Sequence, residues 1–108
     1  MHNNDRKFLE WEELLQNNSS IGPNETLLYT AKKLYAIFKA MGVPPKMVHF
    51  MEFVDNDENK EKEIWLEWFH GTKPNLTVCA NGEIKGFISS DIHNPETDVD
   101  FSIKFENW

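Results

Sequence analysis

The hydrophobic period of this chain changes once, at Pro44 and Pro45. Before the two prolines, apolar residues recur every three or four positions, as they do on one face of an α-helix. After them, apolar and polar residues alternate, as they do along a half-buried β-strand. Proline lacks an amide hydrogen and disfavours helical backbone at the residue before it, so no helix continues through this point. The sequence therefore predicts an α+β chain in which helices come first and strands follow.

Two helices are predicted before the prolines, over residues 5–16 and 24–41. Asn24 is a suitable N-cap for the second helix. Gly42 suits the position directly after that helix, because glycine readily adopts left-handed backbone there. The apolar stripes of the two helices are Phe8, Trp11 and Leu15 in the first, and Leu27, Leu28, Ala31, Leu34, Tyr35, Phe38 and Met41 in the second.

Five strands are predicted after the prolines, with polar turns or loops between them. They cover residues 47–54, 63–70, 76–80, 83–88 and 99–105. Asn81 and Gly82 join the third strand to the fourth, and this pair favours a type I′ turn in which both residues have a positive φ. The predicted fold is α+β, with two N-terminal helices packed on a four- to five-stranded antiparallel β-meander, in a single domain over 1–108.

Composition and charge exclude several classes of protein. The one cysteine, Cys79, rules out an intrachain disulfide framework. A net charge of −7 argues against broad nucleic-acid binding, which requires a basic surface. No stretch is long and apolar enough to predict a membrane span, and the first residues lack the apolar core of a signal peptide. We therefore expect a cytoplasmic protein, in the cell that makes it or in an infected host.

The side chains that could carry chemistry form no recognised motif, so we expect no metal site and no cofactor. His49 and His70 fall on neighbouring predicted strands and could approach each other. Asp91 and His93 lie two residues apart in a predicted loop, where turn chemistry is the commoner role. A small hydrolase-like enzyme that uses a pocket around these side chains remains the weakest of three hypotheses.

Two of the predicted strands are apolar on both faces, although only two helices are available to cover the sheet. The first helix, the loop after the fourth strand or the C-terminal Trp108 could cover the second face; otherwise it is free to bind a partner or a second copy. The residues predicted to bind a partner are Trp65, Phe69, Met51 and Phe53, with Asp55, Asp57 and Glu58 as acids that steer a basic surface. A register shift of one residue would exchange Trp65 for Trp68 on this face.

The segment from Leu34 to Ile84 runs through a helix, a Gly-Val-Pro-Pro turn, a strand, an acidic turn, an apolar-Glu-Trp strand and an Asn-Gly hairpin. This order resembles that of a broad group of small uncharacterised bacterial and phage proteins, over about half of the chain. The residues concerned are Gly42, Pro44, Glu67, Trp68, Asn81 and Gly82. The chain has DNDENKEKE where the group usually has an Asp-Gly turn. The resemblance implies a meander and a prokaryotic or viral origin, and it implies no catalytic residue.

Taken together, these features favour a small acidic, non-enzymatic binding protein that sterically engages a macromolecular partner. An inhibitor, antitoxin, immunity protein or phage anti-defence protein would act in this way. The partner would be a protein, and a basic surface on it would complement the acids of the chain. The alternative is a homo-oligomeric structural or assembly protein whose apolar faces cover each other.

Overall fold

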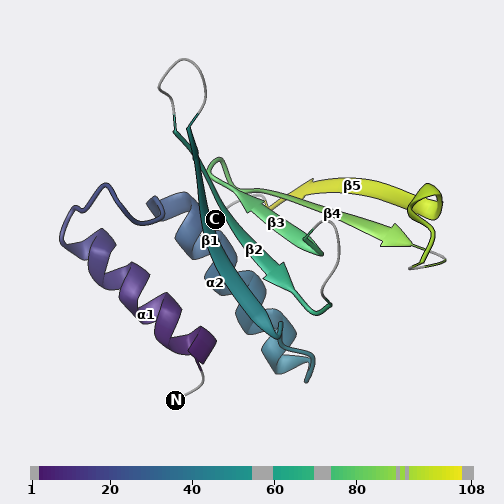
Figure 1. Ribbon diagram of the computed structural model, residues 1–108. Helices are drawn as coiled ribbons and strands as arrows, with labels where there is room; N and C mark the ends of the chain where they lie inside the picture. The colour runs from purple at the N-terminus through teal and green to yellow at the C-terminus, as the bar shows by residue number, and fades with distance from the viewer. Residues whose placement is uncertain (1–2, 55–59, 70–73, 90, 92, 106–108) are drawn as a thin grey trace.

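The chain folds into two layers, a pair of helices and one antiparallel sheet (Figure 1). The computed structural model describes residues 3–54, 60–69, 74–89, 91 and 93–105. The helices are α1 (Asn3–Gln16) and α2 (Glu25–Ala40), and a 3-10 turn, η1 (Pro95–Thr97), precedes the last strand. The strands are β1 (Met47–Val54), β2 (Lys60–Glu67), β3 (Leu76–Cys79), β4 (Glu83–Ser89) and β5 (Asp98–Lys104). They pair antiparallel in the order β1-β2-β3-β4-β5, which confirms the predicted α+β fold with N-terminal helices.

Both ends of α2 form as the sequence predicts. Asn24 Oδ1 accepts a hydrogen bond from the backbone N–H of Leu27 at 2.8 Å, which is the expected N-cap. Gly42 follows the helix with a φ of 82°, a backbone conformation that glycine adopts without strain. Met41 is the C-cap and is 66% exposed, so its place on the predicted apolar stripe was wrong.

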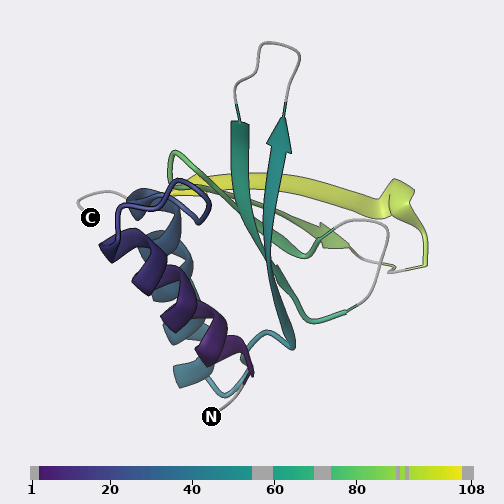
Figure 2. The ribbon, with the colours of Figure 1, turned by 60° about the vertical axis from the view of Figure 1, so that its left-hand side comes forward.

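The core lies between the helices and one face of the sheet. Figure 2 shows α1 and α2 on the same side of the strands. Phe8 of α1 joins the two helices, because its ring centroid lies 5.1 Å from that of Tyr35 on α2, and within α1 it lies 5.3 Å from that of Trp11. The buried apolar side chains are Phe8, Trp11, Leu27, Leu28, Ala31, Leu34 and Tyr35 from the helices, and Val48, Ile64, Leu66, Val78 and Ile84 from the sheet.

Trp68 belongs to this helix-covered side. Its ring packs edge-on against Phe38 of α2, with 4.8 Å between the centroids. Its indole Nε1 donates a hydrogen bond to the backbone oxygen of Val43 at 2.8 Å. The register that the sequence left open is therefore settled, with Trp68 toward the helices and Trp65 away from them.

β2 begins and ends three residues earlier than the predicted 63–70. Its last residue, Glu67, pairs with the first residue of β1, so the ladder between the two strands ends there. The backbone N–H groups of Trp68 and Phe69 donate instead to Oδ1 of Asn75, at 2.6 and 3.0 Å. A side chain thus replaces a strand partner, which the hydrophobic pattern does not signal. The other predicted boundaries agree with the structure within two residues.

The turn between β3 and β4 differs from the predicted type. Gly82 has a φ of 88°, but Asn81 does not have a positive φ, so the turn is not type I′. The backbone N–H of Gly82 donates to the oxygen of Cys79 at 2.9 Å. This is the pattern of a three-residue hairpin loop in which the last residue has left-handed backbone.

The two helices cover only part of the sheet. α1 packs against β1, and α2 packs against β2 and β3. In both views the β4–β5 hairpin extends away from the helices (Figures 1 and 2). In the part of the chain that the structure describes, no helix has the length and apolar character required to cross a membrane.

Candidate functional site

The side of the sheet that faces away from α1 and α2 is called the open face here. It is found from the register, because alternate residues of a strand point to opposite faces and paired residues point to the same face. Val48, Ile64 and Leu66 are buried toward the helices, so the residues between them point the other way. On β1 and β2 the open face consists of Met47, His49, Met51, Phe53, Glu61, Glu63, Trp65 and Glu67.

An aromatic cluster of Met51, Phe53 and Trp65 lies on the open face. Phe53 and Trp65 stand on either side of the pair formed by Met51 and Glu63, and their ring centroids are 6.4 Å apart. The indole Nε1 of Trp65 donates to Glu63 Oε1 at 3.0 Å, which fixes the orientation of the ring. Phe53 is 41% exposed and Trp65 is half-buried. Three of the side chains predicted to bind a partner are therefore brought together.

The other predicted residues do not join this cluster. Phe69 lies beyond the end of β2 and is 68% exposed. It lines a shallow hollow with Met47 and Glu67, at the opposite end of the open face from Phe53. The three predicted acids, Asp55, Asp57 and Glu58, lie outside the described residues.

Acidic side chains dominate the open face, a feature that the sequence analysis missed. Continuing the register through β3 and β4 to β5 places six carboxylates and two lysines on it. The carboxylates are those of Glu61, Glu63, Glu67, Glu83, Asp98 and Asp100, and the lysines are Lys85 and Lys104. Along β2 every open-face residue except Trp65 is a glutamate.

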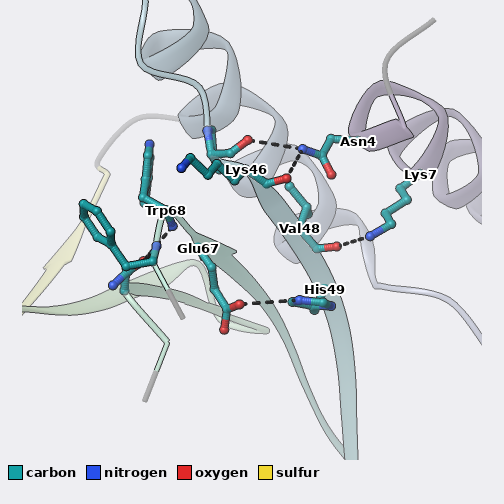
Figure 3. A network of polar contacts seen from close by, with 10 residues as sticks. Asn4, Lys7, Lys46, Val48, His49, Glu67 and Trp68 are labelled. Carbon is teal, nitrogen blue, oxygen red and sulfur yellow. Dashed lines mark hydrogen bonds and ion pairs between the residues drawn. The ribbon is translucent and has the colours of Figure 1, made fainter. Parts of the chain in front are cut away.

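Two contacts affect the charge of individual carboxylates on the open face. His49 Nε2 lies 3.5 Å from Glu67 Oε2, an ion pair when the histidine is protonated (Figure 3). The hydroxyl of Ser102 donates to Glu83 Oε1 at 2.6 Å and lowers the pKa of that carboxyl, with Lys85 acting in the same direction. Glu83 therefore stays ionised to a lower pH than an isolated glutamate.

Cys79 lies on the open face opposite Glu63 and is partly buried. Burial raises the pKa of its thiol; Lys85 opposes this, and the carboxylates of Glu63, Glu83 and Glu61 reinforce it. A nucleophilic cysteine requires the opposite, a positive surrounding that lowers the thiol pKa. The surroundings of Cys79 thus hold it in the unreactive thiol form.

The histidines considered for catalysis are not assembled into a site by the described residues. The backbone N–H of His93 donates to Asp91 Oδ1 at 2.9 Å, which is a local turn contact. His70 lies outside the described residues. Within the described ranges, no three side chains of histidine, cysteine, aspartate or glutamate group together in a way that could hold a metal ion.

A second hollow continues the open face across β3, β4 and β5. Its lining combines two aromatic rings with charged and hydroxyl side chains. The residues are Pro74, Thr77, Lys85, Gly86, Phe87, Asp100, Phe101 and Ser102. The open face therefore offers an apolar cluster at Trp65 and a hollow beside it.

Side chains of α1 occupy the outer edge of β1 (Figure 3). Lys7 Nζ donates to the backbone oxygen of Val48 at 2.6 Å. Asn4 is buried, and its Nδ2 donates to the backbone oxygens of Pro45 and Lys46, both at 3.2 Å. These contacts hold α1 against the β1 edge of the sheet.

No family model matches the chain, and comparison with curated proteins and with solved structures finds no match either. The function must therefore be inferred from the geometry and chemistry of the open face.

Proposed function

We propose that this chain is a small binding protein whose open face engages a protein partner and blocks the partner sterically. The observation that carries the proposal is the aromatic cluster of Met51, Phe53 and Trp65, set among carboxylates on a face that neither α1 nor α2 covers. Tryptophan is a favoured anchor of protein interfaces, and methionine adapts to irregular surfaces.

The charge of the open face favours a basic partner. Six carboxylates against two lysines on one face produce a negative field around the cluster. Such a field steers an oppositely charged protein toward the apolar contact and sets its orientation. In the sequence, residues 52–63 hold six acids against two lysines, and Glu61 and Glu63 among them are two of the open-face carboxylates.

The chemistry of the open face favours binding over catalysis. The raised pKa of Cys79 leaves a neutral thiol among carboxylates. A steric mechanism requires only that the chain binds its partner and covers the partner's functional surface. An inhibitor, antitoxin, immunity protein or phage anti-defence protein fits this description, and the resemblance to bacterial and phage proteins makes a bacterial target the first to examine.

The test is affinity capture from a bacterial lysate with immobilised wild type, Trp65→Ala and Ile37→Ala. Ile37 is a matched control because it is 40% exposed but lies on α2, on the other side of the sheet. We expect the wild type and Ile37→Ala to retain a bacterial protein that Trp65→Ala does not retain. Retention of that protein should fall as the salt concentration is raised. Glu61→Lys should also weaken retention. Equal capture by wild type and Trp65→Ala would contradict the proposal, as would capture of nothing that depends on Trp65.

A further inference from the structure

The two outer edges of the sheet differ in how they are covered. At β1, Lys7 donates to the backbone oxygen of Val48, so α1 occupies that edge. At the other edge, β5 pairs with β4 on one side and has no second strand neighbour among the described residues. An uncovered edge strand presents backbone donors and acceptors that can pair with another chain.

β5 has only one of the devices that usually prevent such pairing, its charged side chains, and these all lie on the open face. It contains no proline, and its helix-side residues, Val99, Phe101 and Ile103, are apolar. Val99 is 64% exposed and Ile103 is 50% exposed, and Ile88 of β4, paired with Val99, is 67% exposed. The edge and the apolar face beside it therefore remain uncovered together.

We propose that β5 pairs antiparallel with β5 of a second copy of this chain, in the register centred on Phe101. The sequence of the strand is self-complementary in this register. Asp98 comes opposite Lys104 of the second copy, and Val99 comes opposite its Ile103. Each of these pairs forms twice, and the two Phe101 residues meet at the two-fold axis. Opposite charges face each other on the open face, while apolar residues meet on the helix side.

Other registers with the same facing pair fewer residues of β5. A shift of the pairing by two residues toward the N-terminus sets Asp100 opposite Asp100 of the second copy. Like charges directly opposite each other are destabilising. A shift of two residues the other way sets Asp100 opposite Lys104 of the second copy, but Asp98 and Val99 then lie beyond the end of the partner strand. The register centred on Phe101 pairs the whole of β5.

The dimer would leave the proposed binding surface accessible. In an antiparallel pair of identical strands, the two-fold axis is perpendicular to the sheet. The two open faces then lie on the same side of one continuous sheet, each with its own Trp65. The pairing is independent of the function proposed for that face, and either proposal can fail without the other.

The experiment is sedimentation velocity of the full chain across a concentration series, with a charge-swap set at Asp98 and Lys104. We expect a wild-type dimer that Asp98→Lys and Lys104→Asp each weaken by at least about tenfold, because each change sets like charges opposite each other twice. The double variant, which exchanges the two charges, should restore dimerisation. Glu96→Lys is the matched control: it makes the same change of charge at an exposed residue just outside the strand and should leave the dimer intact.

A second measurement does not depend on any variant. Amide hydrogen exchange within 98–104 should slow as protein concentration rises, because half of the β5 amides gain a partner in the dimer. The proposal is overturned by a wild type that stays monomeric into the near-millimolar range, or by a charge-swapped double variant that does not regain the dimer. If Trp65→Ala dissociates the dimer and Asp98→Lys leaves it intact, the interface lies on the open face. That result would overturn the proposed β5 pairing as well.

Discussion

The amine of Lys7 on α1 lies 2.6 Å from the backbone oxygen of Val48 on β1 and donates a hydrogen bond to it. This contact joins residues far apart in the sequence and satisfies a carbonyl at the outer edge of the sheet (Figure 3). Asn4, one helical turn earlier, donates to the carbonyls of Pro45 and Lys46, just before β1 begins. α1 therefore acts as a cover for the β1 edge as well as a part of the core.

The Lys7→Met variant should lower the free energy of unfolding by about 1.5–3 kcal/mol, the usual net contribution of a hydrogen bond made by a charged group. Methionine keeps most of the apolar length of the side chain and removes the donor. The measurement is urea unfolding followed by circular dichroism. Arg6→Met is the control, since Arg6 is an exposed neighbour on the same helix and its loss should change stability little. Equal effects of the two variants would mean that the contact with Val48 does not stabilise the fold.

The order and type of the elements could be predicted from local sequence, because period and turn residues act over a few positions. Asn24 and Gly42 mark the ends of α2 through their own backbone and side chain, and both are where the sequence placed them. The end of β2 could not be predicted in this way. The backbone N–H of Trp68, just after β2, bonds to the side chain of Asn75, seven residues further along the chain.

The candidate site was predictable only in part for the same reason. Alternation along β1 and β2 indicated that Met51, Phe53 and Trp65 share a face, and the register confirms it. The position of Phe69 was wrong, since β2 ends before it. The excess of acids on the open face depends on the register of all five strands, which no single segment of the sequence contains.

Trp65 and Trp68 should differ in their contribution to stability. We expect Trp68→Ala to lower the free energy of unfolding by about 2–3 kcal/mol, because its ring packs against Phe38 and its indole N–H bonds to the carbonyl of Val43. Trp65→Ala should lower it by about 1 kcal/mol or less, because that ring lies on the open face. Urea unfolding of the two variants side by side measures the difference. A larger loss for Trp65→Ala would make this residue structural and would weaken the proposed binding role.

Cys79 should react slowly with iodoacetamide near neutral pH. Burial and nearby carboxylates raise the pKa of the thiol, so the reactive thiolate forms only at higher pH than in the unfolded chain. The rate of alkylation is measured against pH for the native protein and for the protein in urea. Removing single charges should move the inflection of the native rate–pH curve in opposite directions. Glu61→Gln should move it to lower pH, and Lys85→Ala should move it to higher pH. A native inflection at or below that of the unfolded chain would contradict this account.

Gly82→Ala should destabilise the protein more than Gly42→Ala. Both glycines have a positive φ, 88° and 82°, so each substitution costs about 1–2 kcal/mol for left-handed backbone at a residue with a Cβ. A Cβ at Gly42 meets nothing within 4 Å, whereas one at Gly82 comes 3.2 Å from Cγ2 of Thr26 at the start of α2. The difference between the two free energies of unfolding therefore measures how closely the β3–β4 turn packs on α2. In a Thr26→Ser background, which removes that methyl group, the cost of Gly82→Ala should fall toward that of Gly42→Ala. An unchanged cost in that background would show that the turn has room for a side chain and that its positive φ alone requires glycine.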